Sequence, residues 1–335
     1  MLEKKKWKYG KTFAYSITYD EGFDDLLKNT LPIHEEFGIP GHVSMVVSQI
    51  GQYRNLPGSS YDKNFRHMDC DQLRFLISKG WSVSSHSMTH GTMSENTYME
   101  VVESRLQLEE MLGIPVTAFI VPGNNDNHPP VVPYARENGY LSVYTVTDGL
   151  NNYDSDFYAL CRAALVEEGF APFFARYDHY HRLLEAREYG GWIVDYTHLS
   201  NPTVLCPQKE ISQDGLKRRF EKIREIGGDE VWTAVPEEVV DYILTNKHTE
   251  IVKLRKTDEK INFKLKDIGI PVRVQNRQLT FGCEMPVKLR RPAVIVNGKQ
   301  KADVTKMDRN RLLFTLEVKD GMRVEITDLK QSGLC

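Results

Sequence analysis

The sequence has 335 residues, of which 41% are hydrophobic and 27% charged, and a formal net charge of -3. This length exceeds what one hydrophobic core usually organises, so we expect a globular protein with one large and one smaller domain. The weak net charge gives no reason to expect a nucleic acid or an anionic membrane as partner, and no apolar run is long enough to span a bilayer.

The cysteines and the first residues bear on localisation. The five cysteines are widely scattered, which gives no disulfide framework and fits a reducing compartment. Residues 4–10 are basic but have no apolar stretch after them, so this segment is not a signal peptide as it stands. We therefore predict a cytoplasmic protein, or a secreted or periplasmic one if a signal peptide has been removed. The sequence is compatible with a homo-oligomer.

Strand and helix patterns alternate over the first 248 residues. We expect strands at residues 12–19, 42–47, 116–121, 140–146, 192–197 and 231–234, and a further short strand that begins at Trp81. We expect helices at residues 24–37, 69–79, 94–112 (capped by Ser94), 131–138, 212–226 and 236–245. This alternation predicts an α/β fold with parallel strands.

The pattern changes after about residue 249. Short alternating runs at residues 261–265, 271–275, 293–296 and 312–318 are separated by turns, and Asn297-Gly298 and Asp320-Gly321 are hairpin signals. We predict a small all-β domain over residues 249–335, by default a sandwich, and a first domain over residues 1–248. The β domain contains no obvious catalytic cluster, and sugar binding, packing and dimerisation are open roles for it.

Polar residues follow several of the expected strands. Asp20 and Glu21 come directly after the strand at residues 12–19, where catalytic groups of α/β folds gather. His86 and His90 are four apart; if the chain turns helical after Ser85, the two imidazoles share one face and can chelate a divalent metal such as zinc. The alternative is that both histidines are polar residues of a surface turn.

Later histidines and tryptophans are less specific. His198 follows the strand at residues 192–197 and is either functional or a capping or core histidine. We interpret His179 and His181 as loop or surface residues. Trp192 and Trp232 lie within strand-like runs, so we expect them in the core rather than on a binding platform.

Four segments follow one another along the chain: Thr-Tyr-Asp-Glu-Gly at residues 18–22, His-Ser-Met-Thr-His at 86–90, Pro-Gly at 122–123 and Val-Asp-Tyr-Thr-His at 194–198. In this order they resemble the motifs of the polysaccharide deacetylase family, which includes chitin and peptidoglycan deacetylases. The resemblance covers residues 11–245, and the four segments together are much more specific than any one. It implies a distorted (β/α) barrel with a divalent metal at the carboxyl ends of the strands.

The resemblance also implies roles for individual residues. Asp20 would be the general base and His198 the general acid, while Glu21, His86 and His90 would bind the metal, zinc first, with cobalt, nickel or manganese as alternatives. The segment Pro122, Gly123, Asn124 and Asn125 would bind substrate. Such a metal leaves an open position for a water, which a carboxylate deprotonates while an imidazole protonates the leaving amine.

The sequence departs from the family pattern at two positions. Glu21 stands where the family usually has Asp, and Ile120 stands where the family has an arginine that pairs with the base. Without that arginine, Asp20 lacks an orienting partner and a charge that lowers its pKa, and Asn124 or Asn125 is a candidate substitute. Asp148 and Asp154 are candidates for the family's acidic fourth motif.

We predict a metal-dependent hydrolase that deacetylates an N- or O-acetylated carbohydrate, with a carbohydrate or small acetylated molecule as substrate. One alternative is a carbohydrate-binding homologue with weak or no catalysis, which the two departures favour. Another is a hydrolase of a small non-sugar amide, which the apparent lack of a secretion signal favours.

Overall fold

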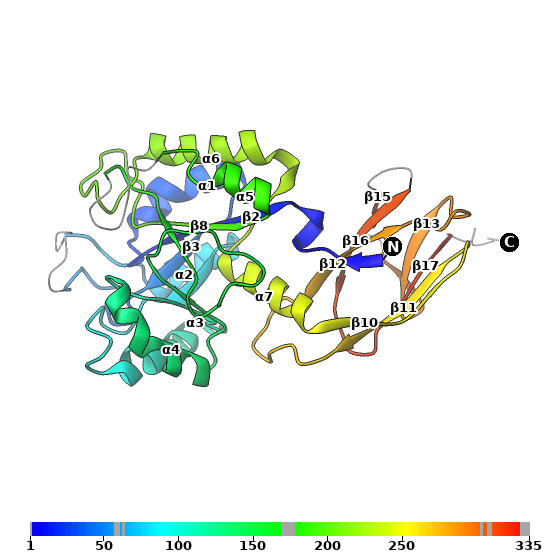
Figure 1. The fold of residues 1–335 in the computed structure, drawn as a ribbon. Coiled ribbons are helices and arrows are strands. Elements are labelled where there is room, and N and C mark those ends of the chain that lie inside the picture. The colour runs from blue at the N-terminus through cyan, green and yellow to red at the C-terminus, as the bar shows by residue number, and fades with distance from the viewer. Residues whose placement is uncertain are drawn as a thin grey trace. The chain divides into compact units, whose positions relative to one another are not determined.

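The computed structural model describes residues 2–56, 61, 64–168, 178–301, 304–306 and 310–328 (Figure 1). The chain forms two compact units. One is Thr12–Val240, and the other combines Met1–Lys11 with Asp241–Cys335. Among the described residues, no helix combines the length and the apolar character needed to cross a membrane.

The larger unit is built on a curled sheet of parallel strands. The strands follow the order β6-β5-β4-β3-β2-β8-β7, and β9 also pairs with β2. Their bounds are β2 (Phe13–Tyr19), β3 (His42–Met45), β4 (Ser82–Ser85), β5 (Ala118–Ile120), β6 (Ser142–Tyr144), β7 (Ala163–Ala164), β8 (Trp192–Thr197) and β9 (Val231–Thr233). A bridge between Tyr144 and Leu160 links β6 to the segment that leads into β7. This is a distorted (β/α) barrel, as the sequence predicts.

Strand β2 lies at the centre of this sheet. All seven of its residues are buried, and it pairs with β8 along one edge and with β9 and then β3 along the other. A run of aromatic and β-branched residues suits such a strand because both of its faces are covered. Trp192 and Trp232, on β8 and β9, are buried in the core as predicted.

Helices connect the parallel strands of the barrel, and a last helix, α7, follows β9. They are α1 (Leu31–Phe37), α2 (Cys70–Ser78), α3 (Ser104–Leu112), α4 (His128–Glu137), α5 (Leu183–Tyr189), α6 (Gln213–Gly227) and α7 (Pro236–Lys247), and α1 and α3 continue the π-helical turns η2 (Leu26–Thr30) and η4 (Tyr98–Glu103). Short 3-10 turns are η1 (Lys8–Gly10), η3 (Val47–Gln49), η5 (Asn125–Asn127) and η6 (Gly228–Glu230). Local chemistry sets the boundaries: Asp69 forms a capping box with Gln72 before α2, and Gly38 adopts a left-handed conformation after α1.

The smaller unit contains two antiparallel sheets. The order is β1-β12-β16-β15 in one sheet and β10-β11-β17-β13-β14 in the other. Their bounds are β1 (Leu2–Lys4), β10 (Thr249–Lys256), β11 (Ile261–Asp267), β12 (Gln278–Glu284), β13 (Pro292–Val296), β14 (Lys299–Lys301), β15 (Val304–Lys306), β16 (Arg311–Glu317) and β17 (Arg323–Asp328). Phe263 of one sheet contacts Phe281 of the other, with ring centroids 5.8 Å apart, so the inner faces share an apolar core.

The structure departs from the sequence-based elements in three places. Residues 271–275 form turns rather than a strand, because Pro271 begins a turn that the Val274 N–H closes by donating to its carbonyl. Ser94 does not cap the following helix, which begins after Thr97. The first eleven residues pack with the β unit rather than the barrel, because β1 pairs with β12. The predicted division at residue 248 therefore differs from these compact units, whose second boundary lies within α7, and whether they fold as separate domains stays a prediction.

Candidate active site at the ends of the barrel strands

Predicted residues from three distant segments follow the carboxyl ends of parallel strands of the barrel. Asp20 and Glu21 come directly after β2, His86 after β4, and His198 after β8. All four are buried or nearly so, with exposed fractions of 9% or less. Parallel strands bring these ends to one edge of the sheet, which is where the barrel fold collects functional groups.

Asp20 is held by an arginine that sequence reasoning missed. The Arg162 guanidinium Nη1 donates to Asp20 Oδ1 at 2.7 Å, and the Ser44 hydroxyl donates to the same oxygen at 3.0 Å. Burial raises the pKa of Asp20, but its interactions with Arg162 above all, and with His86 and His198, outweigh burial and hold that pKa well below its usual range. Asp20 is therefore an ionised, oriented carboxylate.

Arg162 precedes β7 and is itself fully buried. Its Nε donates to the Thr145 carbonyl at 3.0 Å, and its guanidinium lies 4.4 Å from the centroid of the Tyr196 ring. The expectation that Asp20 lacks an arginine partner is therefore wrong: the charge comes from the segment that precedes β7 and not from the strand that ends at Ile120. The available signal was a lone arginine within an otherwise apolar run, since arginine is seldom buried without a partner.

Glu21 is also engaged by cations that the sequence did not point to. Arg54 Nε donates to Glu21 Oε2 at 3.0 Å, and Arg54 Nη2 lies 2.9 Å from the same oxygen. Lys209 Nζ lies 3.5 Å from the other carboxylate oxygen. Burial raises the pKa of Glu21, whereas His198, Lys209, His90 and Arg54 lower it to about 2. Glu21 also has a left-handed backbone, with φ of 69°, which a non-glycine residue adopts only when its surroundings hold it there.

His86 and His90 lie together, but not through a helix. The chain after β4 is a loop in which Ser87 and His90 both have left-handed backbones, with φ of 72° and 61°. The Ser87 hydroxyl accepts a hydrogen bond from the His90 N–H at 2.9 Å, and this turn brings the two imidazole centroids to 5.0 Å. The expectation of a shared helical face is wrong, while the proximity that it implied is present.

The His86 ring is oriented by the backbone. Its Nδ1 lies 2.9 Å from the Ile120 carbonyl, so Nδ1 carries the hydrogen and Nε2 keeps its lone pair. Burial lowers the pKa of His86 to about 4 despite the nearby Asp20 carboxylate. A neutral imidazole with this backbone contact is the form in which histidine binds metals.

His198 lies beside Glu21 and Tyr61. Its Nε2 is 3.9 Å from Glu21 Oε1, and its Nδ1 is 3.2 Å from the Lys209 carbonyl. Burial and the Lys209 charge lower the pKa of His198 to about 3, so the imidazole is neutral before a substrate binds.

The donor set fits a metal ion only in part. His86 and His90 offer imidazole nitrogens, but both oxygens of Glu21 face cations. In the described part of the chain, no group of three or more His, Cys, Asp or Glu side chains is arranged to hold a metal ion. Glu21 in this arrangement therefore does not fit the predicted third ligand.

One further buried histidine lies beside this set. His67 Nδ1 contacts the Glu21 carbonyl at 2.7 Å, and its Nε2 has no hydrogen-bond partner among the described residues. Sequence reasoning did not single it out, because it lies in a loop with no recognisable pattern.

The other predicted residues have local partners. Asn124 accepts from the Asp126 N–H, and Asn125 contacts Thr147 Oγ1 and the Val146 N–H. The two side-chain amides therefore bind these groups and do not orient Asp20. Pro122 is buried and Gly123 is exposed, directly after β5. Among the acidic candidates, Asp148 pairs with Arg182 and His181, while Asp154 is an exposed loop residue.

Comparison with known proteins supports the family resemblance for part of the chain. The family model described as polysaccharide deacetylase matches residues 9–143, which include Asp20, Glu21, His86, His90 and the Pro122–Gly123 pair. Over these residues the chain is similar to the polysaccharide deacetylase family. This family is one of hydrolases, and the resemblance seen in the sequence motifs is confirmed.

Individual relatives of this chain are distant. It is 23% identical over 150 residues to YxkH of Bacillus subtilis (strain 168), named as a polysaccharide deacetylase, covering 44% of this chain and 49% of YxkH. It is 21% identical over 277 residues to a gellan lyase of Bacillus sp, covering 78% of this chain and 10% of that protein. The chain thus spans less than half the length of either relative.

Solved structures with similarity to this chain include two deacetylases. One is a polysaccharide deacetylase from Mycobacterium smegmatis, with a TM-score of 0.47 and 16% identity over 73% of this chain and 94% of that one. The other is the Streptococcus pyogenes deacetylase PplD in complex with acetate, with a TM-score of 0.37 and 16% identity over 44% of this chain and 62% of that one.

Proposed function

We propose that the barrel unit is a hydrolase that removes acetyl groups from an N- or O-acetylated carbohydrate. The match of residues 9–143 to the polysaccharide deacetylase model supports the class of reaction. The observation that carries the proposal is the buried Asp20–Arg162 pair, with its 2.7 Å contact at the carboxyl ends of the barrel strands. Amide or ester hydrolysis needs a carboxylate that stays ionised at the working pH and can take a proton from the attacking water.

Each residue has a proposed role in this reaction. Asp20 accepts the proton of the water that attacks the acetyl carbonyl, and Arg162 and Ser44 keep the carboxylate oriented. His198 is neutral at rest, and negative charge that develops on the substrate beside it raises its pKa, so that it takes up a proton from solvent and passes that proton to the leaving group. Pro122, Gly123, Asn124 and Asn125 would contact the sugar.

Metal dependence is a separate part of the proposal. We propose that His86 and His90 bind a divalent cation, zinc or else cobalt, nickel or manganese. Such an ion supplies Lewis acidity and lowers the pKa of a bound water. Glu21 would join as the predicted third ligand only after Arg54 releases it, because Arg54 now holds its Oε2.

The contacts of Glu21 favour a second candidate function. A carboxylate that is already neutralised by Arg54 and Lys209 offers little attraction to a further cation. The second candidate is therefore a carbohydrate-binding protein with weak or no deacetylation, which would keep the barrel fold but bind no metal.

The test combines elemental analysis with acetate release. Purified protein is expected to contain a divalent metal, to release acetate from N-acetylated chito-oligosaccharides or O-acetylated xylan, and to lose activity on chelation until zinc or cobalt is added. His86→Ala should lose both metal and activity. The control His128→Ala changes a half-buried histidine at the start of α4 that contacts the Tyr158 carbonyl, and should keep both.

Other outcomes separate the alternatives. Activity that survives exhaustive chelation, in protein without bound metal, would contradict metal dependence but not hydrolysis. Sugar binding without acetate release from any acetylated substrate would favour the second candidate.

A further inference from the structure

The solvent-facing side of the five-stranded sheet carries a broad groove. It has a volume of about 1000 Å³ and runs across β10, β11, β17 and β13, entirely within the β unit. Four cationic residues line it, namely Lys253, Arg255, Lys264 and Arg323. Its one acidic lining residue, Glu325, lies 3.8 Å from Lys260, so the groove has a marked excess of positive charge.

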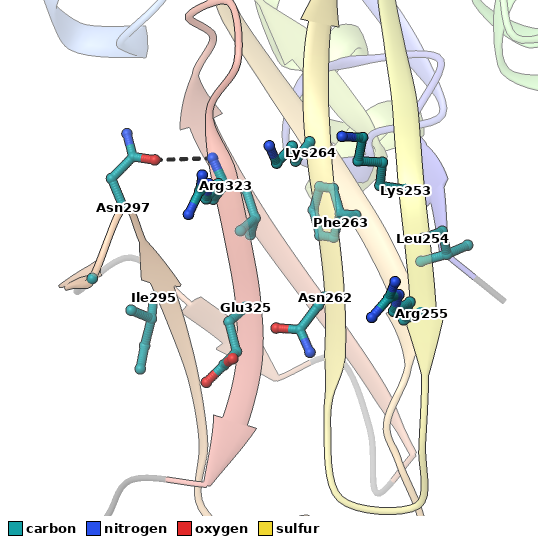
Figure 2. Close-up of a pocket in the computed structure, with 12 residues that line it drawn as sticks. Lys253, Leu254, Arg255, Asn262, Phe263, Lys264, Ile295, Asn297, Arg323 and Glu325 are labelled. Carbon is teal, nitrogen blue, oxygen red and sulfur yellow. Dashed lines mark hydrogen bonds between the residues drawn. The ribbon is translucent and has the colours of Figure 1, made fainter.

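The cations lie in neighbouring positions on adjacent strands. Lys264 on β11 stands directly opposite Arg323 on β17 in the antiparallel register. Figure 2 shows Lys253, Lys264 and Arg323 in a row across three strands, with Arg255 and Asn262 in the row below. In the described part of the chain, none of the four cations forms an ion pair with a carboxylate.

This arrangement is unfavourable for the sheet by itself. Like charges placed directly opposite each other on adjacent strands repel and destabilise the pairing. The proximity of Arg323 and Lys253 lowers the pKa of Lys264, because a further positive charge there is disfavoured. A ligand that brings negative charge into the row would relieve this repulsion.

A backbone irregularity adds the third cation to the row. The register of β10 shifts between Val252 and Arg255, and Lys253 within this bulge has a left-handed backbone with φ of 54°. A β-bulge redirects side chains, and lysine adopts a positive φ only at some energetic cost. The row of positive charge therefore contains two energetically unfavourable features, namely the like-charged pair Lys264 and Arg323 and the bulge at Lys253.

The rest of the groove indicates which kind of anion fits. Asn262 and Asn297 offer amide groups to hydroxyls, and half-exposed Leu254 and Ile295 offer apolar surface. The lining contains a single aromatic residue, Phe263, which is 2% exposed and so unable to stack on a nucleic-acid base. The net charge of -3 for the chain also disfavours a nucleic acid.

We propose that this groove binds an acidic polysaccharide, a chain whose sugar units carry carboxylates. The row of Lys253, Lys264 and Arg323 would pair with those carboxylates, and the amides would bind sugar hydroxyls. The choice of a polysaccharide among polyanions rests on the proposed function of the barrel, whereas the anion site rests on the groove. The β unit would then hold the polymer that the barrel unit acts on.

The test measures binding without any reaction. The full chain is titrated with polygalacturonic acid that carries no acetyl groups, with dextran as the neutral polymer, by isothermal titration calorimetry. We expect binding to polygalacturonic acid only, and weaker binding when salt rises from about 20 mM to about 200 mM, because exposed charges are then screened.

A pair of double variants tests the groove itself. Lys264→Gln combined with Arg323→Gln should weaken binding by about fivefold or more, since both charges face the proposed ligand. The matched control, Lys288→Gln with Arg290→Gln, removes one lysine and one arginine from the same unit outside the groove and should bind as the unmodified protein does. Thermal unfolding checks that both variants are folded.

The contrary results are distinct. Absence of binding to polygalacturonic acid, or equal weakening in both double variants, would overturn the proposal. Tighter binding to single-stranded DNA or to anionic lipid vesicles would overturn the choice of partner. Because acetate release from a small acetylated sugar is measured separately, loss of polymer binding with intact acetate release refutes the groove alone, and the reverse result refutes the hydrolase.

Discussion

Arg162 decides the ionisation of Asp20, so its removal is the most direct change at the candidate site. In Arg162→Met the buried carboxylate loses its 2.7 Å partner, and the pKa of Asp20 rises. A base that must be ionised then works only at higher pH, so the acidic limb of the pH profile of acetate release should shift upward. Breaking a buried ion pair should also lower the free energy of unfolding by about 3–5 kcal/mol.

A surface variant provides the control for this prediction. Arg187→Met removes a half-exposed ion pair with Glu230, and its effect on the free energy of unfolding should stay below about 1 kcal/mol, with an unchanged pH profile. Arg162→Lys retains the charge and should shift the profile less than Arg162→Met. An acidic limb that is the same in all three variants would show that Arg162 does not tune Asp20.

His34 makes the stability of the barrel depend on pH. It is fully buried, with Nδ1 against the Ile39 carbonyl and Nε2 against the Tyr19 hydroxyl, and burial lowers its pKa from 6.5 to about 3. Between these values the unfolded chain binds a proton that the folded chain excludes, so stability falls as pH falls below about 6.5. The contribution of one such group is about 1.4 kcal/mol per pH unit.

The variant His34→Gln isolates this contribution. The free energy of unfolding, measured by urea denaturation between about pH 6.5 and about pH 5, should depend less steeply on pH in the variant, by about one proton. The other buried histidines are present in both proteins, so the difference in slope belongs to His34. Equal slopes would mean that His34 binds a proton in the folded state.

At the scale of single elements, the segment from His86 to His90 shows that spacing can predict proximity for the wrong reason. Four residues in a helix would have placed both imidazoles on one face. In the observed loop, the left-handed conformations of Ser87 and His90 and the hydrogen bond from the His90 N–H to the Ser87 hydroxyl bring the two imidazoles together. Positive φ values at non-glycine residues leave no trace in hydrophobic periodicity, so this geometry was not predictable from the sequence.

Helix α2 shows the opposite case, in which local sequence determines the boundary. Asp69 accepts from the Gln72 N–H while the Gln72 side chain accepts from the Asp69 N–H. Asp69→Ala should therefore lower the free energy of unfolding by about 0.5–2 kcal/mol. The control Asp71→Ala changes a side chain that is 96% exposed and should have a smaller effect. Chemical denaturation of both variants measures the difference, and equal effects would contradict the role of the cap.

At the scale of the whole molecule, the first strand pairs the N-terminal residues with a strand from the last quarter of the sequence. Strand β1 pairs with β12, and both the Tyr242 hydroxyl and the Asn246 amide donate to the Lys5 carbonyl at 2.8 Å. Deletion of residues 1–6 should expose the edge of β12 and leave those two side chains without their acceptor. We expect faster hydrogen exchange in strands β12 and β16, with unchanged exchange in β2 and β8. Uniform exchange rates across all four strands in the shortened protein would contradict this role.

Much of the architecture was predictable because it depends on periodicity. The run at residues 12–19 is apolar on both faces, which requires a strand covered on both sides, and alternation with amphipathic helices then implies parallel strands. Hairpin signals such as Asn297-Gly298 similarly revealed the β unit. The prediction was wrong at residues 271–275, where alternation is present but Pro271 begins a turn, and incomplete at β1, whose partner lies far along the chain.

The sequence by itself determined the barrel class, the β unit and the acidic and histidine motifs, because each depends on residues close together in the chain. Only the tertiary structure decided which cations meet the two carboxylates. Arg162 and Arg54 lie 142 and 33 residues from the acids that they pair with, and no local pattern encodes such contacts. The same is true of the basic groove, since Lys264 and Arg323 become neighbours only when β11 and β17 pair in a particular register. Charge neutralisation acts through space, whereas periodicity acts along the chain, and for that reason the fold was easier to predict than the chemistry of its site.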